Sequence, residues 1–547
     1  MNADPNQAAG PRRRWWHRIP VRARHHWRPV ALFAAFLVLT LGVFGSSRVI
    51  PYVTGDDRYE APAVTENIAG NTDLFDTSVA HSVQLTFRED DYQRILDTWY
   101  DEGEKEYLEA DVVIDGVRVE NVGVRLKGNS TLMSLQDPDA DPGEQRRGPG
   151  GMQLPEGMEL PEGVQPPGGG GGADGQGGPP GGGIGSVTLS AEEPENLPYL
   201  ISFDEFSEGR VFQGRSEIAV RPSSSNSTVA LNESVALSMV DRTGQTGQAH
   251  TYAAFTVNDR PTTARLIVEH PDESYTEQQF DTAGVLYKSR ASSSFTDQGD
   301  DPTAYEDDVN QINRIGSQDL QPVINLIQWV QRATDEEFAA ERGDHLDIDS
   351  FARYLATQNL LLNFDDMGGP GKNYYLWYDL DTETFEVITW DLNLTLSGDA
   401  ATGPHDEVSM ADLFGGGGPG GGPAPGGNAV PDGGEAGAPA GGEGGAGPGG
   451  AEGGGPGPMM QGHLLKDRFL ETPEFTEVYD QAYRDLYQQI YGSGAAVAAL
   501  DSAAAAATAA APEENRATIA QEADELRALL QQRAQALATD PLLSSTS

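Results

Sequence analysis

Residues 359–398, NLLLNFDDMGGPGKNYYLWYDLDTETFEVITWDLNLTLSG, place acidic and amide side chains at the ends of predicted secondary-structure elements. The apolar spacing predicts a helix over about 349–362. Asp365 and Asp366 follow this helix and lead into a loop rich in glycine and proline, which interrupts regular structure. Because carboxylates in such a loop can face solvent or a ligand, the loop is a candidate functional site.

A β-hairpin is predicted immediately after this loop. Residues 373–378 and 384–390 alternate bulky and polar side chains on either side of a short turn. Asn373 begins the first strand, and Asp391 follows the second. Since the two ends of a hairpin lie side by side, we expect Asn373 and Asp391 to face the Asp365 loop. Oxygen ligands of this kind suit a hard divalent cation, so the cluster is typical of a phosphate and metal site.

The rest of the folded chain divides into a strand-rich first half and a helix-rich second half. Hairpins are predicted around Asp115-Gly116 and Asn258-Asp259, with a helix at about 228–242 between them. Pro322 suits the first turn of a further helix. Because the candidate site lies between the halves, we expect a bilobal α+β enzyme with an antiparallel sheet in its first half.

Composition separates the predicted folded domain from low-complexity segments. Of the 547 residues, 66 are glycine and 35 are proline, and many of these gather at 136–185 and 404–462. Such segments bury too little apolar surface to offset the loss of chain entropy, so we predict a disordered insertion and a disordered linker. We expect the folded domain over 81–403 and packing helices over 463–540.

Net charge and cysteine content exclude several classes of function. The formal net charge of −48 argues against a nucleic-acid partner, because phosphate backbones are bound by an excess of Lys and Arg. A nucleotide can still bind where divalent cations lie between its phosphates and the carboxylates. The absence of cysteine removes disulfides, zinc–thiolate sites and thiol nucleophiles together.

The amino terminus predicts export. Residues 1–28 contain many arginines and precede an apolar stretch within 29–50, which orients the start of the chain in the cytoplasm. We expect residues 29–50 to form a single-pass anchor in the cell membrane, residues 51–80 to form a stalk, and the main domain to be extracytoplasmic. The apolar run is shorter than the roughly 20 residues of a typical span, so secretion after signal cleavage is the alternative.

Several motifs that occur in order over about 80–400 resemble the CotH spore-coat kinase family. They are Val124-Arg-Leu-Lys-Gly-Asn-Ser130, Leu200-Ile-Ser-Phe-Asp-Glu-Phe206, Leu231-Asn-Glu-Ser-Val-Ala-Leu237, Val268-Glu-His270, Leu286-Tyr-Lys-Ser289, Asn363-x-Asp365, Asn373-Tyr-Tyr-Leu376 and Trp390-Asp-Leu-Asn-Leu394. The chain looks like a membrane-anchored, actinobacterial-type member. The resemblance implies a protein-kinase-like fold that binds ATP with Mg²⁺ or Mn²⁺ and phosphorylates Ser or Thr of a protein substrate.

The resemblance also implies roles for individual residues. Asp365 is the candidate catalytic base, with Asp366 as the second candidate, whereas Asp391 and Asn373 are the candidate metal ligands. The alternative is that these side chains only terminate a helix and begin a turn in solvent.

Three further residues are candidates for binding the nucleotide. Lys127 and Lys288 are predicted at strand ends in a lysine-poor chain and could hold phosphate oxygens. Glu233 could position a lysine, as the helix glutamate of protein kinases does. Ordinary exposed lysines and a solvated glutamate are the alternatives.

Two departures from the family pattern support a second hypothesis. Asn393 stands where the family often has a second aspartate, and Asn196-Leu-Pro-Tyr199 lacks the lysine that often precedes this strand. Both changes weaken the binding of metal or phosphate. The second hypothesis is therefore a catalytically inactive surface or cell-wall binding module on a kinase-like scaffold. A third is a glycan hydrolase that uses Asp365 and Asp391 as paired carboxylates about 5–10 Å apart.

Overall fold

The computed structural model describes residues 63–128, 131–135, 189–223, 227–408 and 462–544, all of which belong to one structural unit. The predicted basic N-terminus, membrane segment and insertion at 136–185 lie outside the described residues, as do the first part of the stalk and most of the linker. Among the described helices, none is by itself long and apolar enough to cross a membrane.

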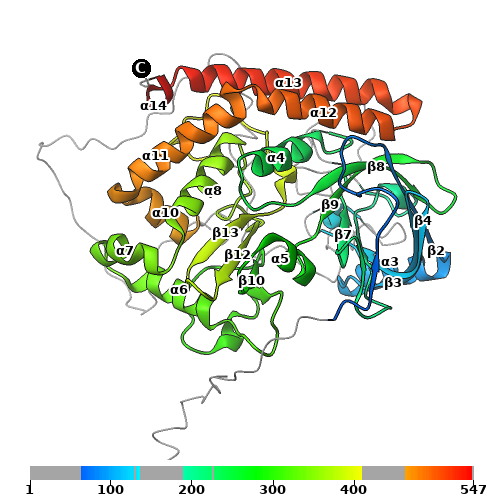
Figure 1. The fold of residues 1–547 in the computed structure, drawn as a ribbon, viewed down its shortest axis with the longest axis horizontal. Coiled ribbons are helices and arrows are strands. Elements are labelled where there is room, and N and C mark those ends of the chain that lie inside the picture. The colour runs from blue at the N-terminus through cyan, green and yellow to red at the C-terminus, as the bar shows by residue number, and fades with distance from the viewer. Residues whose placement is uncertain (1–62, 129–130, 136–188, 224–226, 409–461, 545–547) are drawn as a thin grey trace, which may run out of the picture. The chain divides into compact units, whose positions relative to one another are not determined.

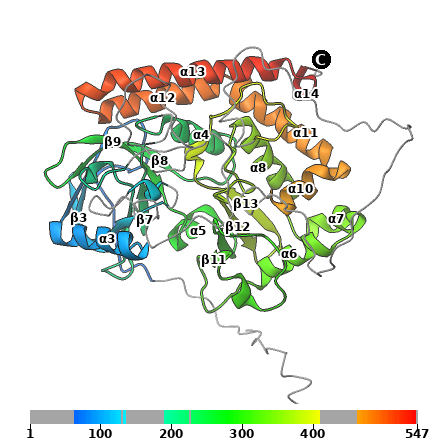
Figure 2. The same cartoon turned by 180° about the vertical axis from the view of Figure 1, so that it is seen from behind.

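A closed barrel forms the first half of the described chain (Figures 1 and 2). Its strands are, in order around the barrel, β2 (His81–Phe87), β3 (Leu108–Ile114), β4 (Val117–Leu126), β5 (Tyr199–Ser202), β7 (Glu217–Val220), β9 (Thr263–Glu269) and β8 (His250–Val257). The two predicted hairpins are confirmed as β3–β4 and β8–β9. The prediction of an antiparallel sheet is corrected, because the parallel pairing of β2 with β8 closes the sheet and removes its edges.

Helix α3 (Glu89–Glu102) contributes to the hydrophobic core of the barrel. Tyr92, Ile95 and Trp99 are buried at the three-to-four-residue spacing that places side chains on one helix face. The helix ends at Gly103, whose φ of 71° lies in the left-handed region that glycine adopts without steric cost.

The second half of the predicted stalk is part of this fold. β1 (Glu66–Ile68) pairs in parallel with β6 (Arg210–Phe212), and Leu74 is fully buried. Gln213 holds this segment in place, because its Nε2 donates to the carbonyls of Ala69 and Thr72. The expected start of the domain near His81 is therefore corrected to include residues 63–80, whose short strand has no apolar periodicity to reveal it.

A second, antiparallel sheet follows the barrel in sequence. Its strand order is β11 (Val309–Gln311), β10 (Gly284–Ser289), β12 (Tyr374–Asp379) and β13 (Phe385–Thr389). The β12–β13 pair is the hairpin predicted from residues 373–390. Gly284 is required beside it, because a β-carbon at this position would lie 2.2 Å from the Trp377 ring.

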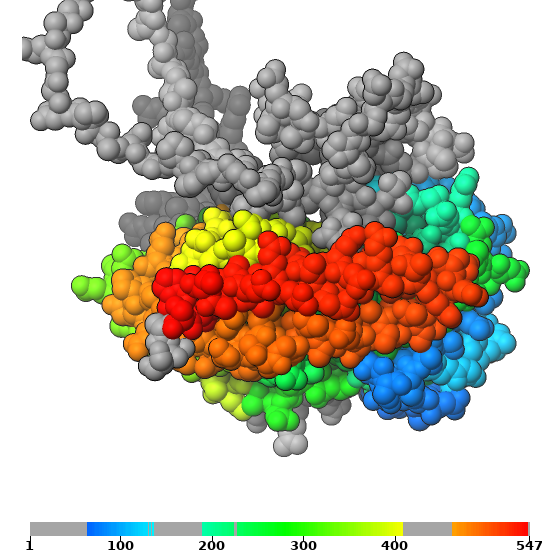
Figure 3. Space-filling model, turned by 90° about the horizontal axis from the view of Figure 1, so that it is seen from above, coloured from blue at the N-terminus to red at the C-terminus, as the bar shows by residue number. Residues whose placement is uncertain are grey.

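Ten α-helices besides α3 belong to the described chain. All except α5 share one hydrophobic core with this sheet, whereas Tyr275 of α5 packs in a smaller cluster with Trp377 and Trp390. They are α4 (Leu231–Arg242), α5 (Glu273–Gln279), α6 (Gln321–Arg332), α7 (Asp335–Glu341), α8 (Ile348–Leu360), α10 (Leu464–Glu471), α11 (Pro473–Tyr487), α12 (Ala495–Ala510), α13 (Arg516–Ala538) and α14 (Pro541–Ser544). The predicted helices at 228–242, after Pro322 and at 349–362 correspond to α4, α6 and α8. Figure 3 shows α12 and α13 lying side by side across one face. The described chain therefore has a mixed α+β fold.

The C-terminal helices complete the end of α8. The last carbonyls of a helix have no partner within it. Here Arg533 on α13 donates to the carbonyl of Asn359, and the Tyr491 hydroxyl donates to that of Leu360. The Tyr483 hydroxyl on α11 donates to Oδ1 of Asn359. The predicted boundary at 403 is therefore not a structural boundary, because residues after the linker hold the helix that precedes the Asp365 loop.

Candidate functional site

The loop after α8 buries two adjacent aspartates. The helix ends at Leu360, Leu362 then adopts the left-handed region at a φ of 50°, and the chain turns inward. Asp365 is 7% exposed and Asp366 is 3% exposed. A buried carboxylate is costly unless hydrogen bonds or charges compensate it, so each must have defined partners.

Asp365 is held by neutral donors. The backbone N–H of Gly371 donates to its Oδ1 at 2.6 Å, and Nδ2 of Asn373 donates to its Oδ2 at 2.9 Å. Burial, together with the nearby charges of Asp391 and Asp366, raises the pKa of Asp365 to about 6, although these two hydrogen bonds oppose the shift.

Glycines allow the loop to wrap closely around Asp365. A β-carbon at Gly369 would lie 2.4 Å from Cα of Asp365, and one at Gly371 would lie 2.7 Å from its Oδ2. Larger residues at these two positions would therefore displace the carboxylate.

Asp366 has a different set of partners. The backbone N–H of Gly368 donates to its Oδ1 at 2.7 Å, and Nζ of Lys466 lies 2.5 Å from its Oδ2. Lys466 belongs to α10, on the far side of the linker in sequence. The two aspartates, which the sequence left as alternative bases, are thus distinguished by their partners.

Asp391 lies in the turn after β13, with a φ of 54°. Its Oδ1 forms an ion pair with Nη2 of Arg221, and Nε of Arg221 lies 2.8 Å from Glu233 on α4. Burial alone would lower the pKa of Arg221, but the two carboxylates outweigh this effect and raise it, so the guanidinium stays charged. The partner of Glu233 is therefore an arginine, which corrects the prediction that this glutamate positions a lysine.

Asn232, the neighbour of Glu233, fixes the same turn. Its Nδ2 donates to the carbonyls of Asn393 and Thr395, at 2.7 and 3.1 Å. The first turn of α4 therefore positions Asp391 in two ways. Asn232 binds the backbone that follows Asp391, and Glu233 pairs with Arg221, which in turn pairs with the Asp391 carboxylate.

Four of the chain's five lysines lie around this acidic cluster: Lys127, Lys288, Lys372 and Lys466. Burial, together with the charges of Arg221 and Arg125, lowers the pKa of Lys127 to about 7. Burial lowers the pKa of Lys288 to about 8, although Asp391 and Asp365 oppose the shift.

Aromatic rings lie below these two lysines. Nζ of Lys127 is 5.0 Å from the Trp390 ring centre, and Nζ of Lys288 is 4.9 Å from that of Tyr375. Within the part of the chain that the structure describes, neither ammonium forms an ion pair. Both cations are thus desolvated without a direct counter-charge, as expected for groups that receive an anion.

A half-buried pair that the sequence reasoning did not select lies close to Lys127. Nδ1 of His270 is 2.7 Å from Oε2 of Glu217. Burial and the charge of Lys127 lower the pKa of His270 to about 4, so the imidazole is neutral at pH 7. Burial would raise the pKa of Glu217, but His270, Lys127 and Arg125 outweigh it and lower it to about 2. Glu217 is therefore a permanent negative charge behind Lys127.

The oxygen ligands suit a cation that is shared with phosphates. Within the described residues, no three His, Cys, Asp or Glu side chains converge on a common point. However, Oδ2 of Asp391 and Oδ1 of Asn373 accept no hydrogen bond from any described residue. Mg²⁺ is typically bound by one or two carboxylates plus substrate phosphates and water, so this donor set fits it better than an all-protein cage would.

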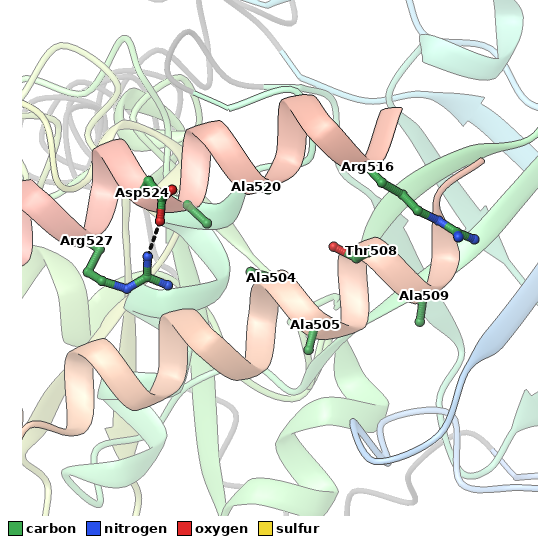
Figure 4. Close-up of a pocket in the computed structure, with 9 residues that line it drawn as sticks. Ala504, Ala505, Thr508, Ala509, Arg516, Ala520, Asp524 and Arg527 are labelled. Carbon is green, nitrogen blue, oxygen red and sulfur yellow. Dashed lines mark hydrogen bonds and ion pairs between the residues drawn. The ribbon is translucent and has the colours of Figure 1, made fainter. Parts of the chain in front are cut away.

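A surface groove lies elsewhere on the molecule. Its volume is about 590 Å³, and Figure 4 shows it between α12 and α13, lined mainly by alanines with Asp524 and Arg527 at one end. Arg527 forms ion pairs with Asp524 and Asp501. The groove carries no convergent polar groups, so the charged cluster is the better candidate site.

The structure thus brings together all seven predicted residues: Asp365, Asp366, Asn373, Asp391, Lys127, Lys288 and Glu233. The sequence reasoning missed Arg221, Lys466, Glu217 and His270. His270 has two local signals, because it follows a predicted hairpin strand and ends the Val268-Glu-His270 motif. Arg221 has none, because no strand was predicted before it, and Lys466 has none because a long low-complexity segment separates it from the loop.

Comparison with known proteins gives one family. The model of the family described as CotH kinase protein matches residues 185–537, which is more than half of the chain and includes the C-terminal helices. No curated protein matches the chain.

Proposed function

The chain belongs to the CotH kinase protein family, and from this premise we propose that it binds ATP with Mg²⁺ or Mn²⁺ and transfers phosphate to Ser or Thr of a protein substrate. One observation carries the proposal. A buried carboxylate of raised pKa, Asp365, shares a cluster with Asp391 and with three cations from other segments, Arg221, Lys127 and Lys288. Phosphoryl transfer needs this combination, because it depends mainly on positioning and on charge neutralisation.

The proposed role of each residue follows from its hydrogen-bond and ion-pair partners. In this proposal the acceptor hydroxyl hydrogen-bonds to the carboxylate of Asp365, which orients the hydroxyl oxygen and takes its proton. The oxygen forms a bond to the γ-phosphorus, the bond between that phosphorus and the β–γ bridging oxygen breaks, and ADP leaves. Lys127, Lys288 and Arg221 neutralise phosphate oxygens throughout.

Asp391 and Asn373 would hold the divalent cation through their free oxygens, Oδ2 and Oδ1. A bound cation would supply further neutralisation of the phosphate charge. The bridge from Glu233 through Arg221 to Asp391 resembles the strand-to-helix ion pair of protein kinases, with arginine in place of lysine. This bridge supports the proposal that the barrel and the helix-rich second half are the two lobes of a kinase-like fold.

The location of the reaction rests on the sequence. The arginine-rich residues 1–28 and the apolar stretch within 29–50 support a membrane-anchored protein with its main domain outside the cytoplasm. The protein substrate is then another extracytoplasmic protein.

A second candidate function is a binding module without activity. Asn393 and the ion pair between Arg221 and Asp391 favour it, because both reduce the negative charge offered to a cation. The glycan hydrolase alternative stays a prediction that none of these findings tests.

Thermal unfolding of the full chain with ATP and Mg²⁺ or Mn²⁺ separates the two candidates, because a ligand that binds only the folded state raises the melting temperature. We expect a metal-dependent rise in wild type that is lost in Asp391→Asn. The matched control is Asp381→Asn, at the exposed tip of the same hairpin. No rise with any nucleotide would contradict the kinase proposal and favour the binding module.

A further inference from the structure

Lys466 engages the acidic loop from outside it. The side chain of Asp366 is 3% exposed and that of Lys466 is 23% exposed, and the ammonium lies 2.5 Å from Oδ2 of the carboxylate. The other oxygen of Asp366 accepts from Gly368. Both oxygens of Asp366 are therefore occupied, one of them by a full positive charge.

Asp365 differs from its neighbour in this respect. Its two oxygens accept only from the neutral donors Gly371 and Asn373, and no cation of the described residues forms an ion pair with it. Asp365 is therefore the carboxylate of the loop whose oxygens are not held by a described cation.

The helix that carries Lys466 is anchored on both sides. Leu465 and Phe469 are buried, and Arg468 donates to the carbonyl of Val330 on α6. His463, just before the helix, lies 3.0 Å from the hydroxyl of Tyr374, the residue that follows Asn373. The ammonium of Lys466 is thus held relative to both ends of the loop.

We infer that Lys466 is a positioning residue for phosphoryl transfer: its ion pair with Asp366 fixes the loop and assigns the role of base to Asp365. The inference rests on the proposed function and goes beyond it, because it distinguishes the two aspartates and places a residue of the C-terminal helices in the reaction. Without Lys466, Asp366 loses the cation at ion-pair distance and keeps only the weaker influence of Lys372, so the loop is expected to rearrange to solvate its carboxylate.

The test is a double-mutant cycle in the full chain, with phosphate release from Mg·ATP to water as the assay. Lys466→Met should lower kcat at least tenfold and change KM for ATP less than twofold, because Lys466 contacts the loop and not the phosphates. Lys466→Arg, which keeps the charge, should stay within about threefold of wild type. Asp365→Asn should cost on the order of 10²-fold in kcat and Asp366→Asn less than tenfold.

The decisive variant is Lys466→Met combined with Asp366→Asn. Once Asp366 is replaced by Asn, loss of Lys466 should lower kcat by less than a further threefold. The double variant should also regain most of the melting temperature that Lys466→Met alone loses. The matched control is Lys105→Met, which removes the remaining lysine of the chain, packed at 5.9 Å over the Trp99 ring in the barrel region. This control should leave kcat within about twofold of wild type.

Three results would overturn the inference: Asp366→Asn as damaging as Asp365→Asn, an unchanged cost of Lys466→Met in the Asp366→Asn background, or an effect of Lys466→Met on KM alone. Failure of the proposed function has a different signature. Wild type would then release no phosphate and show no nucleotide-dependent rise in melting temperature, whatever the melting temperatures of the Lys466 and Asp366 variants are.

Discussion

Arg221 and Arg533 are both buried arginines, yet their guanidinium groups have opposite kinds of partners. Arg221 lies between two carboxylates, Glu233 and Asp391, at the edge of a cluster that also contains Lys127. Arg533 is fully buried and donates to neutral groups, among them the carbonyls of Ala400 and Asn359. Within the described residues, it has no carboxylate at ion-pair distance.

The difference separates a structural role from a functional one. The carbonyls of Ala400 and Thr402 accept from no other described donor, so the Arg533 guanidinium replaces the water that they would otherwise bind, whereas the carbonyl of Asn359 also accepts from the backbone N–H of Leu362. The partners of Arg221 are two carboxylates, in a cluster that also contains Lys127 and Lys288. In the proposed function Arg221 contacts a phosphate, whereas Arg533 contributes only to stability.

The largest effect is expected for Arg533→Met. The substitution removes a fully buried side chain and leaves the carbonyls of Ala400 and Thr402 without a described donor, and we expect it to lower the free energy of unfolding by about 3–5 kcal/mol. The control is Arg527→Met on the same helix, whose side chain is 30% exposed and forms surface ion pairs. That loss should stay below about 1 kcal/mol. Denaturant unfolding compares the two, and equal losses would remove the distinction between Arg533 and a surface arginine.

Asp365→Asn should separate activity from stability. Loss of the base should reduce kcat on the order of 10²-fold. Because the folded protein raises the pKa of Asp365 to about 6, from 3.8, its ionised form opposes folding above pH 6. The variant should therefore gain about 1–2 kcal/mol of stability at pH 8, and the gain should vanish as the pH falls below about 4.

Unfolding curves at both pH values measure this gain, with Asp381→Asn as the exposed control. A variant that is less stable than wild type at pH 8 would show that the Asp365 carboxylate stabilises the fold. Keeping this carboxylate for catalysis would then not reduce stability.

A smaller effect is expected for the pH dependence of nucleotide affinity. In the proposed function, Lys127 and Lys288 bind phosphate only in their protonated forms, and their pKa values of about 7 and about 8 lie near neutrality. Affinity for Mg·ATP should therefore fall at least tenfold between pH 7 and pH 9, with uptake of protons on binding. Titration calorimetry in two buffers of different ionisation enthalpy measures both quantities.

Arginine remains protonated throughout this range, so Lys127→Arg and Lys288→Arg should each flatten the profile. A wild-type affinity that is independent of pH would show that these lysines do not face the phosphates, and would weaken the contrast with Arg533.

Local patterns were sufficient for the elements of the site. The turns Asp115-Gly116 and Asn258-Asp259, and the alternation across 373–390, correspond to hairpins because these signals act between neighbours in sequence. The barrel closure by β2 and β8 was not predicted. The two strands carry no mark of their pairing, since its register depends on residues more than a hundred positions apart.

The acceptors of the site could be predicted from local sequence, because Asp365, Asp366, Asn373 and Asp391 lie within 359–398 and one helix, one loop and one hairpin suffice to bring them together. The donors that meet them come from distant segments. Arg221 reaches Asp391 across 170 residues, and Lys466 reaches Asp366 across 100. The physical reason is that a buried carboxylate must be compensated by whatever cation the fold places beside it, and local sequence contains no information about that neighbour.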